Sequence, residues 1–301
     1  MPNAPEKERD TVIVAANPFS GSRSNRPRVR KFVAALKKRG LEAHVAWSPD
    51  ERSAMLADAG LRAQCRCVVA AGGDGTVHAL LDEDLPGPLA AMPLGTENLF
   101  ARHFGFTRDA ENLAERIARG QVVRMDLGRV NGRLFALMFG AGIDGEIAHR
   151  LGKWRTTRRG LRRVNYLSYV PTIAAAFRGY RFPRLELVAD GERATGRHAF
   201  VFNLPSYALR LPLGARARPN DGLLDWVVFE RPGRLDLLRY AWALVRGKHL
   251  GMKDVRHGRA RRVRIASEES VPIQVDGDAC GATPAEAEIV PAALRVVGPI
   301  E

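Results

Sequence analysis

Glycine and threonine residues follow two short apolar runs in the first third of the chain, with a spacing that could bind phosphate. The run 67–71 ends at the glycine loop Gly72-Gly73-Asp74-Gly75-Thr76, and the run 89–92 ends at a second loop, residues 93–98, which also contains Gly-Thr. Glycines let a ligand approach the backbone, and the free N–H groups at the start of a following helix bind anions. Taken alone, the glycine loop could still be an ordinary tight turn without a ligand.

Alternating strands and helices are predicted around these loops. The capping box Ser48-Pro49-Asp50-Glu51 starts one helix that reaches about Ala59, and Gly40 and Gly120 end two others. Strands are predicted over 11–16, 41–47, 67–71 and 89–92, and helices over 26–39, 49–59, 77–82, 99–103 and 109–119. This pattern is typical of a doubly wound parallel sheet, an α/β domain over residues 11–125, whose carboxyl edge would carry both loops.

The pattern changes after Met125, where we place the domain boundary. Asn131-Gly132 is a strong hairpin signal, and Asp-Gly turns follow at 190–191, 221–222 and 276–277. We therefore predict an antiparallel β-sandwich domain over residues 126–301, interrupted by helices near 151–178 and 234–247. The predicted strands are 127–130, 134–139, 185–188, 198–202, 223–229, 263–265, 273–275 and 294–297.

The composition is that of a folded soluble protein. Of 301 residues, 46% are hydrophobic and 27% charged, and the length favours two domains. No apolar run approaches the roughly 20 residues that span a bilayer, and the polar start does not resemble a signal peptide, so we expect a cytoplasmic protein. The cysteines Cys65, Cys67 and Cys280 are odd in number and fit core or strand thiols better than a zinc site.

The charge is the most unusual feature of the composition, because the formal net charge is +14. Residues 147–185 contain ten Lys or Arg and no acidic residue. Such a surface attracts nucleic acid, anionic membranes or phosphorylated small molecules, while a solvated helix face is the simpler explanation. We expect peripheral binding to an anionic membrane surface, at its inner face, through a basic helix that also carries Trp154, Leu161 and Val164. Its basic residues would be Lys153, Arg155, Arg158, Arg159, Arg162 and Arg163.

The order of the motifs NPFSG, AAGGDGT, PLGTENLFAR, FGAGIDGEI, NDGLLDW, RARRVRI and VDGD resembles the bacterial lipid kinases of the diacylglycerol kinase and sphingosine kinase superfamily. The resemblance covers residues 11–297. It implies an α/β nucleotide domain followed by a β-sandwich domain, with ATP bound between them. It also implies ATP- and Mg²⁺-dependent phosphorylation of a lipid hydroxyl, of diacylglycerol or a related lipid.

The resemblance further implies a nucleotide site built from both loops. Asp74 would hold the catalytic Mg²⁺ directly or through water, and Ser48 would contact nucleotide unless it serves only as a helix N-cap. The implied nucleotide-binding residues are Asn17, Ser48, Gly72, Gly73, Asp74, Gly75, Thr76, Val77, His78 and Thr96.

The remaining implied residues lie in the second half. The family's general base is the Glu of an Asp-Gly-Glu turn, and this chain has Asp276-Gly277-Asp278 there, which is also ordinary hairpin chemistry. Asp278 would be the base of a slower enzyme, and Asp276 would orient it or contact metal. A structural Mg²⁺ would be held by Asp221 and the backbone carbonyls of Arg218 and Leu223, unless Asp221-Gly222 is a metal-free turn. Asp144 would face the lipid or begin a helix.

Other functions are weighed against this one. An NAD kinase shares the glycine loop but should have Asn-x-Gly-x-x-Gly-Phe-Leu in place of PLGTENLFAR. A nucleotide-binding sensor without catalysis would fit the shorter Asp278, and the departures His78-Ala79 and Asn98-Leu99 put substrate and rate in doubt. A nucleic-acid binder has only the charge in its favour, so we expect no nucleic-acid partner. The sequence leaves the lipid acceptor and a possible homo-oligomer open.

Overall fold

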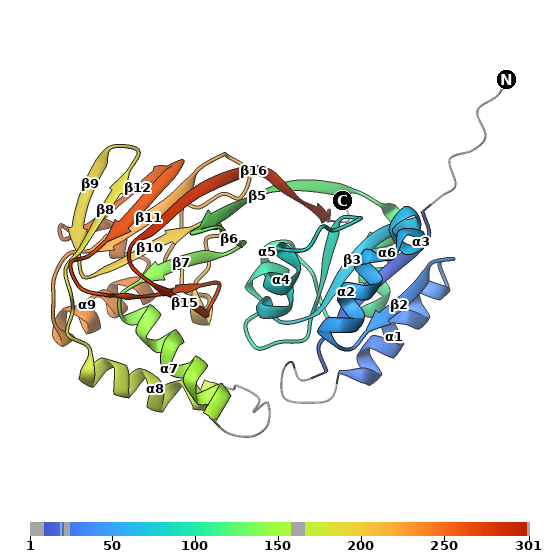
Figure 1. Cartoon of the computed structure of the whole chain (residues 1–301), viewed down its shortest axis with the longest axis horizontal. Coiled ribbons are helices and arrows are strands. Elements are labelled where there is room, and N and C mark those ends of the chain that lie inside the picture. The colour runs from blue at the N-terminus through green and yellow to red at the C-terminus, as the bar shows by residue number, and fades with distance from the viewer. Residues whose placement is uncertain (1–8, 19, 21–24, 158–165, 300–301) are drawn as a thin grey trace. The chain divides into compact units, whose positions relative to one another are not determined.

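The computed structural model describes residues 9–18, 20, 25–157 and 166–299, with the backbone alone for residues 153–157, 166–170 and 210 (Figure 1). The chain forms two compact units, Met1–Met125 with Leu294–Glu301 and Asp126–Ala293. The division at residues 125 and 126 lies where the composition pattern changes. The last eight residues belong to the first unit, whereas the sequence analysis placed them in the second domain.

The first unit contains a parallel sheet with the strand order β2-β1-β3-β4, and the end of the last strand of the chain is added beside β4. Its strands are β1 (Thr11–Ala16), β2 (Glu42–Ala46), β3 (Cys65–Gly72) and β4 (Leu89–Pro93). Its helices are α1 (Arg26–Lys37), α2 (Pro49–Ala57), α3 (Ala59–Gln64), α4 (Asp74–Leu81), α5 (Leu99–His103) and α6 (Ala110–Arg119). All four predicted strands and all five predicted helices are present, which confirms the doubly wound α/β fold.

Capping residues set the helix ends in this unit. Ser48 Oγ accepts a hydrogen bond from the N–H of Glu51, and the Glu51 carboxylate accepts one from the N–H of Trp47, so the predicted capping box starts α2. The helix ends at Ala57 and not at Ala59, because Asp58 has extended backbone angles and its carboxylate caps α3 instead. The sequence analysis missed this second, short helix.

Arg116 holds the C-terminal segment against the first unit. Its guanidinium is buried and donates hydrogen bonds to the carbonyls of Val297 and Gly298. It also stacks 4.0 Å above the ring of Phe106, and burial lowers its pKa. Strand pairing of Val296 with Leu89 adds to this anchor. These contacts explain why a segment so far along the chain is part of the first unit.

The second unit is an antiparallel β-sandwich. One sheet has the order β12-β11-β10-β7-β14-β15, and the other contains β16-β13-β8-β9 with the β5–β6 hairpin. Its strands are β5 (Val122–Val130), β6 (Arg133–Phe135), β7 (Met138–Ala141), β8 (Leu185–Ala189), β9 (Glu192–Gly196), β10 (His198–Phe202), β11 (Leu224–Phe229), β12 (Val255–Ala260), β13 (Arg262–Ala266), β14 (Pro272–Val275), β15 (Asp278–Ala282) and β16 (Ala285–Val297). Its α-helices in the described residues are α7 (Ile143–Thr157), α8 (Tyr166–Gly179) and α9 (Arg234–Val245).

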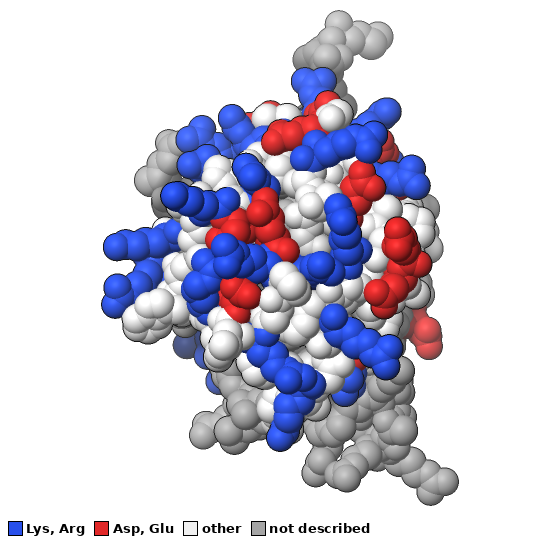
Figure 2. Space-filling view, turned by 90° about the vertical axis from the view of Figure 1, so that its left-hand side faces the viewer, with Lys and Arg blue, Asp and Glu red and all other residues white. Residues whose placement is uncertain are grey.

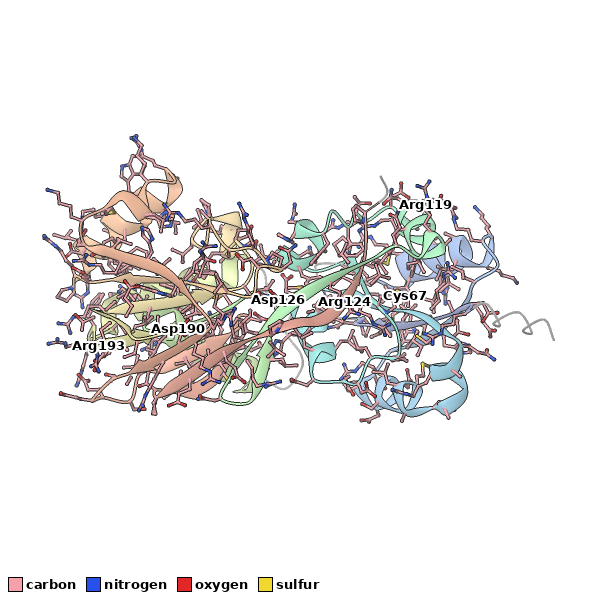
Figure 3. The ribbon with its side chains drawn as sticks, turned by 90° about the horizontal axis from the view of Figure 1, so that it is seen from above. Cys67, Arg119, Arg124, Asp126, Asp190 and Arg193 are labelled. Carbon is pink, nitrogen blue, oxygen red and sulfur yellow. The ribbon has the colours of Figure 1, made fainter. Side chains whose placement is uncertain are left out.

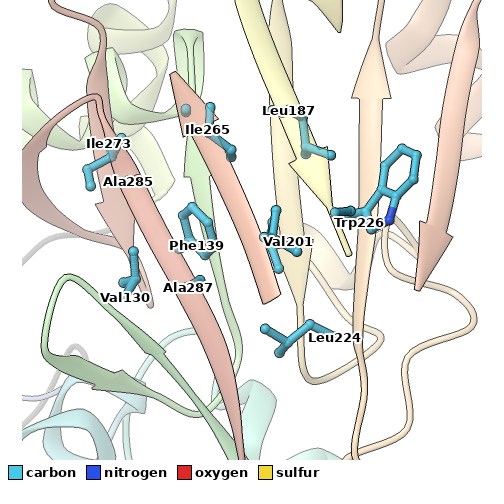
Figure 4. Close-up of a cluster of buried hydrophobic side chains, with 14 of the residues drawn as sticks. Val130, Phe139, Leu187, Val201, Leu224, Trp226, Ile265, Ile273, Ala285 and Ala287 are labelled. Atoms are coloured by element: carbon cyan, nitrogen blue, oxygen red, sulfur yellow. The ribbon is translucent and has the colours of Figure 1, made fainter. Parts of the chain in front are cut away.

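The core of this unit is formed by both sheets (Figure 4). Phe139, Val201 and Trp226 come from the first sheet, and Leu187 and Ile265 come from the second; all five are at most 1% exposed. Apolar side chains that alternate along each strand meet in the centre, as in other sandwiches. The predicted β-sandwich is therefore confirmed.

Two-residue turns set the register of the hairpins. Asn131-Gly132, Asp190-Gly191 and Asp276-Gly277 all have positive φ at both residues, as a type I′ turn requires. The sequence analysis missed β9, β12 and β15, and it predicted one strand over 134–139 where β6 and β7 are separate. No helix within the described ranges is long and apolar enough to cross a membrane.

Candidate active site

The parallel sheet brings the predicted loops to one edge. From β1 the chain goes to β2 on one side, and it returns on the other side to β3 and β4, so the ends of β1 and β3 form a switch point. Ligands of open α/β sheets bind in the crevice at such a point. The N–H of Asn17, just after β1, donates to the carbonyl of Ala71 near the end of β3, 3.0 Å away. Asn17 and the glycine loop are therefore neighbours.

The glycine loop and the second loop are in direct backbone contact. The carbonyl of Gly72 accepts hydrogen bonds from the N–H groups of Leu94, at 2.8 Å, and Gly95, at 3.2 Å. A Cβ atom on Gly95 would lie 2.5 Å from the Cα of Gly73. Glycine at position 95 is therefore needed for the two loops to pack, and a Cβ atom on Gly73 would be in tight contact with Gly95, at 3.2 Å.

The surroundings of the glycines in the first loop differ, so a side chain would have a different effect at each of them. A Cβ on Gly72 would collide with the side chain of Thr76, so Gly72 is needed by the fold. A Cβ atom added to Gly75 would have no other atom within 4 Å. Gly75 is also exposed, and its φ angle is not positive. The protein itself does not require glycine there. Gly75 lies in the first turn of α4, where a bare backbone leaves N–H groups accessible to an anion.

Polar side chains around the loop have defined places. Asp74 Oδ1 accepts a hydrogen bond from the N–H of Phe100, at 3.0 Å, and so ties the loop to the start of α5. Thr76 Oγ1 is buried and has no hydrogen-bond partner among the described residues. Thr96 is exposed, whereas the side chains of Val77 and His78 are buried in α4.

Asn98 shapes the second loop, and the sequence analysis missed its role. It has a left-handed backbone, its Oδ1 accepts from the N–H of Gly95 at 2.8 Å, and its Nδ2 donates to the carbonyl of the same residue at 2.9 Å. The side chain of Arg108 also donates to the carbonyl of Pro93. The sequence signal that could have indicated this role is an asparagine directly before a short helix and three residues after a glycine, because asparagine tolerates positive φ. Ser48 serves as the N-cap of α2, and a contact with nucleotide remains a prediction.

In the second unit, Asp276 and Asp278 belong to one hairpin turn but have different surroundings. The two carboxylate oxygens of Asp276 accept hydrogen bonds from the N–H groups of Ala136, Leu137 and Met138, each at 2.9 Å. Asp276 thus fixes the turn to the chain that enters β7. Asp278 begins β15 opposite Val275 and is half-buried.

Asp126 is a second structural carboxylate that the sequence analysis missed (Figure 3). Its oxygens accept hydrogen bonds from the N–H groups of Gly222, at 2.8 Å, and Ala292, at 2.7 Å. The buried amide of Asn203 donates to the carbonyls of Asp126 and Ala136. This network fixes the loop before β11, and with it the residues predicted to bind a structural metal ion.

Two carboxylates lie close together at that loop. Asp221 accepts from the N–H of Leu223 and forms an ion pair with Arg259 at 3.2 Å. Burial, and then the negative charge of Asp221, raise the pKa of Asp225 to about 6. The buried Oδ2 of Asp225 finds no hydrogen-bond partner in the part of the chain that is described. Carboxylate oxygens are ligands that Mg²⁺ prefers, and Asp225 leaves one of them without a partner beside Asp221, so this loop fits the implied ion. No group of three or more His, Cys, Asp or Glu side chains that could hold a metal occurs among the described residues.

Asp144 lies in the first turn of α7 and is half-buried, with its Oδ2 enclosed beside the sheet that contains β7 and β14. The hydroxyl of Tyr207 donates a hydrogen bond to its Oδ1. Burial raises its pKa to about 6, against the opposing effect of the hydrogen bonds. The predicted basic helix is described only in part: α7 includes Lys153 and Arg155 without their side chains, and Arg158, Arg159, Arg162 and Arg163 lie outside the described residues.

Comparisons with known proteins agree with this architecture. Residues 11–130 match the model of the diacylglycerol kinase catalytic domain, and residues 138–298 match that of the YegS C-terminal NAD kinase beta sandwich-like domain. The chain is 31% identical to a diacylglycerol kinase of Mycobacterium tuberculosis, over 96% of this chain and 95% of the relative. It is 25% identical to a diacylglycerol kinase of Bacillus subtilis, over 95% of each.

A solved structure of a diacylglycerol kinase from Bacillus anthracis strain Sterne has the same fold, with a TM-score of 0.67 at 18% identity over 97% of each chain. An α/β unit with two glycine loops, followed by a β-sandwich, defines a kinase of this two-unit class. The chain belongs to the diacylglycerol kinase family and is a lipid kinase. The resemblance stated from the motifs is confirmed.

Gly75→Ala tests whether the glycine loop binds phosphate. A methyl group there meets no protein atom but would cover the backbone that an anion approaches. We expect ATP affinity to fall about ten-fold or more, since hydrogen bonds to charged groups contribute about 1.5–3 kcal/mol, while the melting temperature is kept. Isothermal titration measures the ATP affinity, and scanning calorimetry measures the melting temperature.

Gly72→Ala is the control variant, because its added methyl group would collide with the side chain of Thr76 and should lower the stability. Equal ATP titrations for parent and Gly75→Ala would remove the loop from the site.

The raised pKa of Asp144 predicts a pH dependence of stability. The folded protein keeps a proton that the unfolded chain releases near pH 4, so the free energy of unfolding should fall as the pH rises from about 4 to about 6. Asp144→Asn removes this ionisation and keeps an acceptor for Tyr207. Urea unfolding from pH 4 to pH 7 should show parent and variant diverging by up to about 1.4 kcal/mol per pH unit. Parallel curves would contradict the assignment. The pKa of Asp225 is raised as well, but Asp225 titrates in both proteins, so its contribution cancels in the difference between them.

Proposed function

We propose that the protein transfers the γ-phosphoryl group of ATP to the hydroxyl of diacylglycerol or a closely related lipid, with Mg²⁺ as cofactor. The observation that carries the proposal is Gly75: the fold does not need glycine there, but a phosphate approaching α4 does. The family supports a lipid acceptor, and the curated relatives are named diacylglycerol kinases.

The first unit holds the nucleotide in this proposal. The N–H groups of Gly73 and Gly75 would donate to phosphate oxygens at the positive end of α4, whereas the N–H of Thr76 already donates to the carbonyl of Gly73 at 2.9 Å. The buried hydroxyl of Thr76 lacks a partner among described residues and is the side chain we assign to a phosphate oxygen. The carboxylate of Asp74 accepts a hydrogen bond from the N–H of Phe100, at the start of α5. A nucleotide bound beside Asp74 would therefore be coupled to the position of the second loop. Asn17, Ser48 and Thr96 complete the proposed set.

The second unit supplies the proton acceptor. A lipid hydroxyl is a weak nucleophile at neutral pH, so a carboxylate within hydrogen-bond reach must take its proton during transfer. We assign this role to Asp278, which is half-buried. Asp276 is then a positioning residue, because its oxygens accept three backbone hydrogen bonds that fix the turn. Of the two roles expected for Asp276 from the sequence, orienting Asp278 or contacting metal, we propose the first.

Mg²⁺ would neutralise charge on the phosphate oxygens when bound with ATP, and Asp74 is its proposed ligand. A second, structural ion would be held by Asp221 and the carbonyls of Arg218 and Leu223. The ion pair with Arg259 opposes this site, because the arginine already neutralises part of the charge. The unpartnered oxygen of Asp225 favours it.

The alternatives carry less support. The second-half match names an NAD kinase-like sandwich, which describes architecture, while the relatives over nearly the full length are lipid kinases. A sensor without catalysis rests on the shorter side chain of Asp278 alone. It would bind ATP but show no turnover in the assay below.

The decisive experiment incubates the purified protein with labelled ATP, Mg²⁺ and mixed vesicles that contain diacylglycerol, and identifies the labelled lipid. Asp278→Asn should lower kcat by about 10² to 10⁴-fold with unchanged ATP affinity and melting temperature. Asp276→Asn should instead lower the free energy of unfolding by about 1–3 kcal/mol, since backbone N–H groups lose their acceptor. Full turnover by Asp278→Asn, with loss in Asp74→Asn, would transfer the role of base to Asp74.

Metal removal tests the structural ion separately from catalysis. Without nucleotide, millimolar Mg²⁺ should raise the melting temperature above that measured in EDTA, because an ion bound only by the folded state stabilises it. Asp221→Asn should abolish the difference, whereas Asp74→Asn should keep it. If Mg²⁺ has no effect on the parent protein, Arg259 alone neutralises Asp221.

A further inference from the structure

Helix α9 exposes a stripe of large apolar side chains. Leu235 is 83% exposed, and Leu238, Trp242 and Val245 are 55%, 61% and 63% exposed; we call these four residues the α9 stripe. Their spacings of three, four and three residues place them on one face of the helix, opposite the buried Tyr240. The described part of the chain exposes eight large apolar side chains. Half of them lie on this helix, which indicates a surface with a function and not scattered exposure.

Basic residues border the α9 stripe. At about 100° per residue, Arg239 and Arg246 lie on one flank and Arg234 on the other. Residues 231–253 contain six Lys or Arg and one acidic residue, Asp236, which is paired with Arg239 at 3.1 Å. The guanidinium of Arg246 lies 4.5 Å from the ring centroid of Trp242. Lys and Arg are also more frequent than Asp and Glu on the face shown in Figure 2, the side where α9 is labelled in Figure 1.

The helix is held firmly, so its outer face is presented as a fixed platform. The hydroxyl of Tyr240 donates to the carboxylate of Asp254 at 2.9 Å and accepts from the N–H of Arg231 at 3.1 Å. The guanidinium of Arg234 donates to the carbonyl of Phe177 at 3.0 Å, near the end of α8. These contacts use the inner face and the start of α9 and leave the four residues of the stripe exposed.

We propose that the α9 stripe docks the protein on an anionic lipid surface, with α9 lying in the plane of the interface. A strip of Leu, Trp and Val between arginines matches acyl chains below and negative headgroups beside them. A symmetric pairing with a second copy would bring the arginines of both copies together, which is unfavourable. The inference uses none of the nucleotide or proton-transfer residues, and it concerns a segment different from the basic span 147–185.

Vesicle binding by the full chain, without ATP, tests the proposal. The probe is vesicles of phosphatidylcholine with about one third phosphatidylglycerol at low salt, against pure phosphatidylcholine. We expect binding to the mixed vesicles and about ten-fold or greater loss in Leu238→Ser/Trp242→Ser, because two exposed apolar groups lose their burial. Arg246→Gln should lose about five-fold at low salt and little at high salt. Val122→Thr and Arg124→Gln, which alter exposed residues of the first unit, are matched controls and should bind as the parent does.

A second measurement locates the helix at the membrane. Brominated phosphatidylcholine should quench part of the tryptophan fluorescence, and Trp242→Phe should lose that part while it still sediments with vesicles. Equal binding by the parent and Leu238→Ser/Trp242→Ser would overturn the proposal. So would failure of the parent to bind, or a dimer that the same substitutions dissolve in the absence of vesicles. ATP titration of each variant is independent of these results, so a wrong docking surface is distinguished from a wrong proposed function.

Discussion

The close approach of two loop backbones is the constraint on which the nucleotide half depends. The Gly72 carbonyl accepts hydrogen bonds from two N–H groups of the second loop, and a side chain on Gly95 would lie only 2.5 Å from the Cα of Gly73. Asn98 then fixes the second loop from within. Because these contacts occupy Gly72, Gly73 and Gly95, the accessible backbone is left at Gly75. The glycine loop is thus packed against the second loop at Gly72 and Gly73, and its backbone is accessible at Gly75.

Carboxylates in the second unit mainly organise the backbone. Asp126 and Asp276 together accept five hydrogen bonds from backbone N–H groups, and they fix the loop before β11 and the turn between β14 and β15. Such buried acceptors are costly to remove because several donors lose their partner at once. Asp278, one turn residue away from Asp276, is presented by this scaffold. The proposed base, held on a fixed hairpin, would need little reorganisation during proton transfer.

The two exposed features of the molecule serve different needs. The phosphate loops need a bare backbone, which glycine supplies, whereas the α9 stripe needs apolar area at a polar rim. A kinase whose acceptor is a lipid must work where that lipid is, and a docking helix raises the local concentration of acceptor without any contact to the reacting atoms. The proposed docking surface and the proposed phosphate site share no residue and can therefore be altered independently.

The sequence by itself determined the alternation of strands and helices in the first unit apart from α3, the two glycine loops, the type I′ turns at 131–132, 190–191 and 276–277, and the family. These features depend on local backbone preference and on residue order, both of which are written in the chain. Only the tertiary structure decided which glycine is free, that Asp276 accepts three N–H groups, that Arg116 retains the C-terminal segment, and that one face of α9 stays exposed. Each of these depends on what a distant segment places beside the residue, and periodicity within one helix or strand does not contain that information.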